Sequence, residues 1–173
     1  MPGTVCHISV AGNVEPEKNL PQALKLLGKS TELVALSTFY RTASIGRPEQ
    51  PDYLNGVVAV RFGGDARTLK MAVLRVIEMQ LGRVRGFDRY APRTIDLDLL
   101  LFGDEVLDED GLLLPDPDLW CRPFLAAGVL ELEPGLVVPG TGKLLRELAD
   151  LEAVSRLEPA REFSRSTLER LGL

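Results

Sequence analysis

Residues 95–102 read IDLDLLLF, so two aspartates interrupt a run that is otherwise apolar. Residues two apart in a β-strand point to the same face, which groups Asp96 with Asp98 and turns Ile95, Leu97 and Leu99 toward a core. Aspartate is depleted in strands, and two like charges on one face repel each other, so the pair lowers stability unless a positive group or water offsets it. The run therefore predicts a buried strand with a cation on its polar face.

Strand and helix signals alternate along the rest of the chain. We predict strands at 5–10, 31–42 and 52–62, and helices at 20–29, 65–81, about 118–131 and about 143–151. Asp65 is the expected N-cap of the second helix, and Gly28 and Gly82 are the expected stops. The order β-α-β-β-α-β indicates an α+β protein, a ferredoxin-like core forming an α/β/α sandwich with extra C-terminal helices.

The composition suits one domain with a substantial core, since 45% of the 173 residues are apolar. We expect that domain to span residues 1–150. The remaining residues, 151–173, mix arginine and glutamate densely and are predicted to form a solvated helical tail or extension. The formal net charge of −5 argues against a general nucleic-acid-binding protein, which normally has a basic excess.

The cysteines and the N-terminus bear on location. Cys6 and Cys121 are isolated, so neither a zinc site nor a disulfide framework is indicated, and a reducing cytoplasm fits best. No apolar run approaches the roughly 20 residues of a membrane helix, and no leader pattern opens the chain. His7, the only histidine, is expected to be structural. We predict a cytoplasmic monomer without a membrane partner.

An arginine-rich segment lies just before the aspartate strand. It contains Arg83, Arg85, Arg89 and Arg93. Guanidinium groups match phosphate oxygens, and a mobile loop would bring them over a polyphosphate. Two carboxylates with Cα atoms roughly 6.5–7 Å apart bracket the span of a two-metal site, and oxygen ligands suit Mg²⁺. Together these features indicate Mg²⁺-nucleotide chemistry, with a solvent-facing strand and a solvated basic loop as the alternatives.

Two long motifs point to a family. RYAPRTIDLDLLLFG (89–103) and FYRTASIGRPEQPDYLNGVVAV (39–60) closely resemble 6-hydroxymethyl-7,8-dihydropterin pyrophosphokinases, and the resemblance runs from about residue 5 to 140. That family uses ATP and two Mg²⁺ to place a pyrophosphoryl group on the hydroxymethyl oxygen of the pterin, releasing AMP. The resemblance implies the same reaction, with the pterin and ATP as small-molecule partners.

The resemblance also implies roles for individual residues. Asp96 and Asp98 would hold the metals and, with Arg83 and Arg93, form the catalytic group. The ATP side would comprise Glu78, Arg83, Arg85, Arg93, Leu99 through its backbone, Asp116 and Arg122. The pterin side would comprise Thr42, Ile45, Tyr53, Asn55 and Phe124. A flat heteroaromatic ring with donors and acceptors on its rim is well served by two aromatic faces and one amide, which agrees with the last set.

The sequence departs from the family pattern at several positions. Ala11-Gly12-Asn13 replaces Gly-Ser-Asn, and Tyr90-Ala91 replaces Trp-Gly. Gly111, Leu113 and Asp116 stand where the family has Arg, Thr and His on the ATP side. One alternative is therefore a homologue that keeps the pterin pocket but uses ATP weakly, as a pterin-binding protein. A two-metal nuclease or RNA-binding domain is disfavoured by the net charge and by the lack of an RNP-type aromatic sheet.

Overall fold

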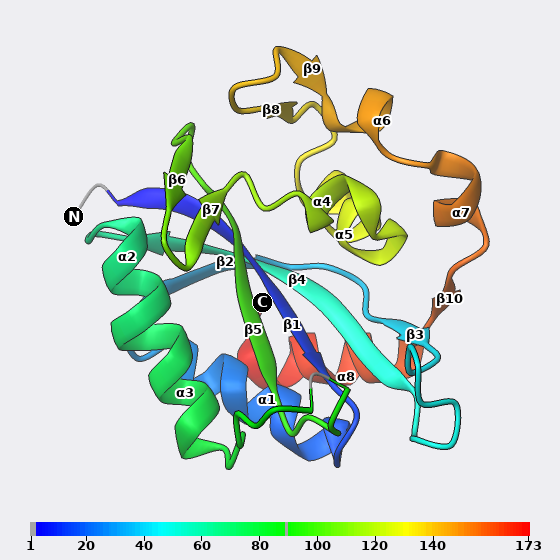
Figure 1. The fold of residues 1–173 in the computed structure, drawn as a ribbon. Coiled ribbons are helices and arrows are strands. Elements are labelled where there is room, and N and C mark those ends of the chain that lie inside the picture. The colour runs from blue at the N-terminus through cyan, green and yellow to red at the C-terminus, as the bar shows by residue number, and fades with distance from the viewer. Residues whose placement is uncertain (1–2, 89) are drawn as a thin grey trace.

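A six-stranded antiparallel sheet crosses the molecule and carries helices on both faces (Figure 1). The computed structural model describes residues 3–88 and 90–173. Its elements, in chain order, are β1 (Thr4–Gly12), α1 (Pro16–Leu27), β2 (Glu32–Leu36), β3 (Tyr40–Thr42), β4 (Tyr53–Phe62), α2 (Ala66–Thr68), the π-helix η1 (Leu69–Leu74), α3 (Arg75–Gln80), β5 (Asp96–Phe102), β6 (Leu107–Glu109), β7 (Leu112–Leu114), α4 (Asp118–Cys121), α5 (Pro123–Leu132), β8 (Val137–Val138), β9 (Lys143–Leu144), α6 (Leu145–Leu148), α7 (Leu151–Ser155), β10 (Glu158–Pro159) and α8 (Arg161–Leu171).

The strands of the main sheet run in the order β10-β3-β4-β1-β5, and β2 also pairs with β4. Alternation along the central strands sends apolar side chains to both faces. Ile8 and Val10 of β1 join a core with α1, α2–α3 and α8. Val57 of β4 and Leu101 of β5 join a second core with α4, α5 and the segment up to α6. The protein is thus a mixed α/β molecule with one helical layer on each face of an antiparallel sheet.

The predicted strand over 31–42 is wrong in one respect, because the chain forms two strands there. Ser37 leaves the β2 line: its Oγ accepts a hydrogen bond from the Val57 backbone N at 2.9 Å, and its own N donates to the Val57 O at 2.9 Å. The chain then resumes as β3 on the same edge of β4, pairing Tyr40 with Asn55 and Thr42 with Tyr53. Because of this break, β3 continues along β4 toward its N-terminal end, where Thr42 pairs with Tyr53.

The helical predictions hold with corrected bounds. Asp65 caps the second helix, accepting a hydrogen bond from the Thr68 N at 2.7 Å, and Gly82 follows it with φ of 76°. That helix contains the π-helical turn η1. The first helix begins earlier, at Pro16, and Gly28 has a right-handed φ of −63° in place of the expected left-handed stop. The predicted segment 118–131 is two helices, and 143–151 contains β9 and the short helix α6, with Leu151 beginning α7.

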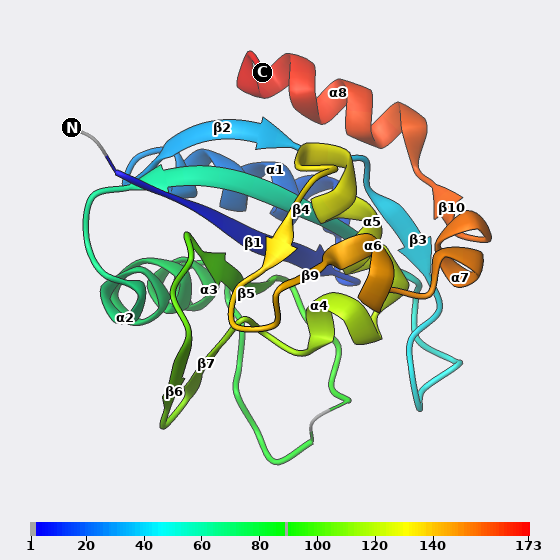
Figure 2. The same cartoon turned by 90° about the horizontal axis from the view of Figure 1, so that it is seen from above.

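The C-terminal segment is helical as predicted, but it is not a solvated tail. The helix α8 packs against α1, and β10 lies beside β3 (Figure 2). Phe163, Leu168 and Leu171 pack on the core beneath α1, and Thr167 is fully buried. Across residues 3–88 and 90–173, no helix has the length and apolar character needed to cross a membrane.

Candidate active site

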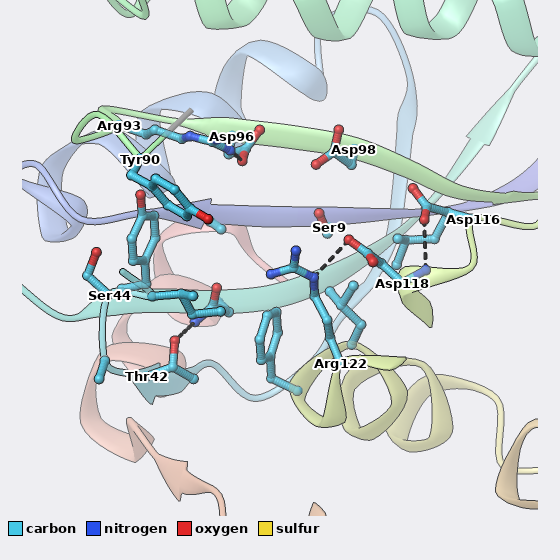
Figure 3. A pocket seen from close by; sticks show the side chains of 18 residues that line it. Ser9, Thr42, Ser44, Tyr90, Arg93, Asp96, Asp98, Asp116, Asp118 and Arg122 are labelled. Carbon is cyan, nitrogen blue, oxygen red and sulfur yellow. Dashed lines mark hydrogen bonds and ion pairs between the residues drawn. The ribbon is translucent and has the colours of Figure 1, made fainter. Parts of the chain in front are cut away.

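A cavity of about 320 Å³ opens between the ends of β1, β4 and β5, the loops that follow β3 and α3, and the segment that carries α4 and α5. Figure 3 shows Asp96 and Asp98 along one strand, with Arg122 and Thr42 facing them from other elements. All five residues predicted for the pterin line this cavity, together with Arg93, Asp96, Asp98, Asp116 and Arg122. The structure therefore brings most of the predicted site together.

The aspartate pair lies on the cavity face of β5, as strand alternation predicts. Asp96 pairs in register with Ala11 of β1, and Asp98 pairs with Ser9. Leu97, between them, is buried in the opposite core. Burial, together with the negative charges of Asp96 and Asp116, raises the pKa of Asp98 to about 7. Negative charge is concentrated here, and a cation in this position would offset it.

Arginines crowd Asp96 from the preceding loop. Arg83 and Arg93 each form an ion pair with one of its carboxylate oxygens. Arg83 also pairs with Glu78, and Arg85 pairs with the other oxygen of Glu78. The Glu78 side chain is only 2% exposed and accepts a hydrogen bond from the Leu97 N at 2.9 Å, which ties α3 to β5.

Four of the predicted ATP residues are not part of the cavity lining. Glu78, Arg83 and Arg85 do not line the cavity, and Leu99 points into the core. Arg89, expected in the same cluster, lies outside the described residues.

Two loops are joined over this end of the cavity. Asn13 is buried, and its Oδ1 accepts a hydrogen bond from the Arg93 N at 2.9 Å while its Nδ2 donates to Gln50 and to the Pro51 O. Gln50 in turn donates from Nε2 to the Tyr90 O at 2.9 Å. The loop after β3 and the arginine-rich loop are thus fastened to each other and to the end of β1.

The lining also contains an amide and two aromatic rings. Asn55 is buried on β4, and its Nδ2 donates to the Thr42 Oγ1 at 2.9 Å and to the Tyr40 O at 3.3 Å. Tyr53 and Phe124 line the same space, from β4 and α5 respectively. Ile45 lies on the loop after β3 and is 68% exposed.

The last wall is built by the turn before α4. Asp116 accepts a hydrogen bond at Oδ1 from the Asp118 N at 2.9 Å, and its own N donates to the Leu100 O at 3.0 Å. Arg122 pairs with Asp118 through Nε and Oδ2 at 2.8 Å. Burial raises the pKa of Asp116, and the charge of Lys70 on η1 opposes this shift.

Sequence reasoning missed several lining residues, among them Ser9, Ser44 and Asp118. Ser9 had a usable signal, because it is a polar residue on the face of β1 that also carries Ala11. Asp118 lies four residues before Arg122, which is the spacing of a helical ion pair.

The family described as 7,8-dihydro-6-hydroxymethylpterin-pyrophosphokinase (HPPK) matches residues 7–134. The chain belongs to this family. A Synechocystis protein named 2-amino-4-hydroxy-6-hydroxymethyldihydropteridine pyrophosphokinase is 35% identical over 93% of this chain and 86% of its own length. Proteins of the same name from Haemophilus influenzae and Pseudomonas aeruginosa are 33% and 34% identical, over 98% and 97% of their lengths.

Solved structures agree on the fold. A crystal structure of an HPPK-DHPS in complex with substrates superposes with a TM-score of 0.70 at 12% identity, covering 89% of this chain and 44% of the other. The Plasmodium falciparum HPPK-DHPS with pteroate superposes with a TM-score of 0.68 at 13% identity. This chain spans less than half of those longer proteins.

Three positions of this chain, Gly111, Leu113 and Asp116, depart from the sequence pattern expected of the HPPK family. Gly111, with φ of 73°, lies in the turn between β6 and β7, where a left-handed conformation favours glycine. Leu113 lies on β7 and is largely exposed, and neither residue lines the cavity. Of the three departures that the resemblance assigns to the ATP side, only Asp116 therefore lines the cavity.

Proposed function

We propose that this chain transfers the pyrophosphoryl group of ATP to the hydroxymethyl oxygen of 6-hydroxymethyl-7,8-dihydropterin, a step of folate biosynthesis. The observation that carries the proposal is that one cavity is lined by two sets of groups, carboxylates with arginines, and an amide with two aromatic rings. In this reaction the hydroxymethyl oxygen attacks the β-phosphorus of ATP and loses its proton. The bond from that phosphorus to the oxygen shared with the α-phosphate breaks, and AMP leaves.

The second set of groups suits a flat ring with a polar rim. Tyr53 and Phe124 supply apolar faces for stacking. Both hydrogens of the Asn55 Nδ2 have acceptors on β3, at Thr42 and Tyr40. The Oδ1 of Asn55 is then the acceptor that it offers to N–H groups of the rim. We propose that this amide orients the pterin so that its hydroxymethyl group points toward the aspartates.

The first set of groups suits a polyanion. Arg93 and Arg122 line the cavity, and Arg83 pairs with Asp96. Forked guanidinium donors match phosphate oxygens and neutralise the charge that develops on them during transfer. Since Arg83, Arg85 and Arg93 are paired with Glu78 and Asp96, a bound triphosphate competes with these two carboxylates for the arginines. Glu78 thereby acts by positioning the arginines.

The carboxylate pair fits Mg²⁺. Asp96 and Asp98 share one strand face, and burial beside like charge already disfavours the ionised form of Asp98. Among the described residues, no group of three or more His, Cys, Asp or Glu side chains is assembled for a metal. Such a sparse donor set is typical of Mg²⁺, which binds through one or two carboxylates plus substrate phosphates. We propose that the pair holds two Mg²⁺, which when bound neutralise the polyphosphate charge.

We also infer a ferredoxin-like topology for the central part of the sheet. The order β5-β1-β4-β2, with α1 and α2–α3 as the crossovers, is compatible with a ferredoxin-like core within residues 1–150. A monomeric state and a cytoplasmic location stay predictions from the sequence.

The test is AMP release by the purified chain supplied with the dihydropterin, ATP and Mg²⁺. We expect one AMP for each pterin consumed, with no AMP released when the pterin is omitted. If the pterin binds in titration calorimetry but no AMP appears, the chain is a pterin-binding protein and the proposed reaction is rejected.

A further inference from the structure

The C-terminal strap, defined as residues 158–171, binds the backbone of Phe39. Phe39 directly precedes β3, whose Tyr40 pairs with Asn55. The strand β10 of the strap pairs with β3, joining Glu158 to Arg41 and Pro159 to Tyr40. The Ala160 N then donates to the Phe39 O at 2.8 Å, and the Phe39 N donates to the Ser164 Oγ at 2.9 Å. Both backbone polar groups of Phe39 are therefore satisfied by the strap.

The ring of Phe39 continues this contact into the sheet. It is fully buried and meets the ring of Phe163 edge-on, with centroids 5.0 Å apart. Its other contact is with Gly56 of β4, where an added Cβ would stand only 2.8 Å from the Phe39 ring. Gly56 follows Asn55 directly, so the strap acts on the backbone beside the pterin amide.

β3 is also held by its pairing with β4, and Thr38 just before it donates from N at 2.9 Å and from Oγ1 at 3.1 Å to the Glu131 carboxylate of α5. The strand β3 is three residues long, and its chain has just left the line of β2 at Ser37. β10 is the outer neighbour of β3, so without it this short strand would pair with β4 alone. Yet β3 supplies both acceptors of the Asn55 Nδ2, the Thr42 Oγ1 and the Tyr40 O. A shift of β3 would rotate the Asn55 amide and so move its Oδ1, the acceptor proposed for the pterin ring.

The strap is itself fixed to the body of the protein. Leu168 and Leu171 pack on the core beneath α1, and Thr167 is fully buried. It also lies beyond residues 7–134, which match the family. The strap therefore links α1 to β3 through an element that the family match does not contain.

We infer that the C-terminal strap is a positioning element for the pterin half of the site: it holds Phe39 and β3 so that Asn55 presents its amide to the substrate. This inference rests on the proposed function for the identity of the ligand. The nucleotide half is built on β5, the arginine-rich loop and the turn before α4, whereas the backbone contacts of the strap are to β3 and Phe39. Loss of the strap contact should thus act on one ligand.

Ser164→Ala tests the inference, because it removes the acceptor of the Phe39 N at the cost of one hydroxyl group, which also donates to the Ala160 O at 2.8 Å within the strap. Leu171→Ala is the matched control, since it thins the packing of the same helix about 10 Å further along. We expect Ser164→Ala to raise the Kd of the dihydropterin about tenfold. This Kd is measured by titration calorimetry in the presence of Mg²⁺ and a non-hydrolysable ATP analogue. The Kd of the analogue alone should change less than about twofold.

Hydrogen–deuterium exchange of the free full-length chain supplies a readout that needs no ligand. Exchange at the Phe39 amide should accelerate in Ser164→Ala and stay at the wild-type rate in Leu171→Ala. Unchanged exchange at Phe39, or equal losses of pterin affinity in the two variants, overturns the inference. If the wild type itself binds no pterin, the proposed function fails, and the exchange result still decides whether the strap holds β3.

Discussion

Asp98 stands on a strand face where like charges gather, between Asp96 and the turn that carries Asp116. Replacing it by asparagine keeps the size of the side chain and removes the charge that would hold a metal. We predict that Asp98→Asn lowers the rate of AMP release by about 10²–10³-fold, the loss typical of one preorganised electrostatic group. Asp104→Asn, an exposed change just beyond the end of β5, is the control. Near-normal release from Asp98→Asn would remove this residue from the metal site.

Asp116 brings a further negative charge to the cavity at a position where the family resemblance leads one to expect histidine. Its Oδ1 accepts a hydrogen bond from the Asp118 N, and the amide oxygen of asparagine preserves this contact. We predict that Asp116→Asn tightens binding of Mg²⁺-ATP by about 1 kcal/mol, because repulsion toward the phosphates falls. Calorimetry with a non-hydrolysable ATP analogue measures the effect, with the exposed Asp108→Asn as control. Weaker binding would mean that the Asp116 carboxylate accepts a hydrogen bond from the nucleotide.

The residues that the family resemblance assigned to the pterin, Tyr53 and Asn55 among them, all line the cavity, and their roles stay predictions. The arginines were harder to place. Arg83 and Arg85 were expected on phosphates, and the structure pairs them with Glu78 and Asp96. A buried glutamate on α3 that accepts from the β5 backbone depends on how two distant elements pack, and periodicity does not report that.

At the scale of elements, α5 approaches β4 unusually closely at Gly128. A Cβ there would stand 2.6 Å from the Val57 Cγ2 and 3.1 Å from the Ser37 Oγ. Alanine favours a helix by about 1 kcal/mol over glycine, so propensity alone predicts a gain. We predict the reverse: Gly128→Ala lowers the free energy of unfolding by about 1–2 kcal/mol, because the two layers must separate or distort.

Urea unfolding of Gly128→Ala beside Gly135→Ala tests this prediction. A Cβ at Gly135 meets no atom within 4 Å, so its effect should stay within about 0.5 kcal/mol. A stabilised Gly128→Ala protein would show that helix propensity outweighs the contact between α5 and β4.

The elements themselves were predictable to different degrees. The helix from Asp65 to Gly82 carries an apolar repeat with a cap and a stop, and these local signals sufficed. Its π-helical turn, Leu69–Leu74, was not predicted, because the apolar residues in this segment keep a spacing close to that of an α-helix. The division of 31–42 was also hidden, because it depends on the bonds between Ser37 and Val57, twenty residues apart.

At the scale of the whole molecule, the C-terminal segment shows how a charged sequence conceals a packed face. Its arginines and glutamates suggested solvent on all sides. Phe163, Thr167, Leu168 and Leu171 nevertheless follow three- and four-residue spacing, and this stripe covers α1. The partner surface on α1 and the edge of β3 lie more than a hundred residues earlier, so no local pattern linked them.

His7 links the stability of the whole fold to pH. It is 4% exposed on β1, and burial lowers its pKa from 6.5 to about 4, although the Glu133 carboxylate lies 3.6 Å from its Nε2. Between these two pH values the unfolded chain binds a proton that the folded chain does not. Stability is therefore complete above about pH 6.5 and is lost as the pH falls toward 4.

We predict that the free energy of unfolding falls by about 1 kcal/mol more in the wild type than in His7→Phe between pH 7 and pH 5.5. Urea titrations at both pH values give this difference, and comparing the two slopes cancels the carboxylates that titrate in both proteins. Glu133→Gln serves as the control, because removing the one facing carboxylate should steepen the wild-type loss. If the two slopes agree, His7 is protonated as readily in the folded chain as in the unfolded one, and the attraction of Glu133 outweighs the cost of burial.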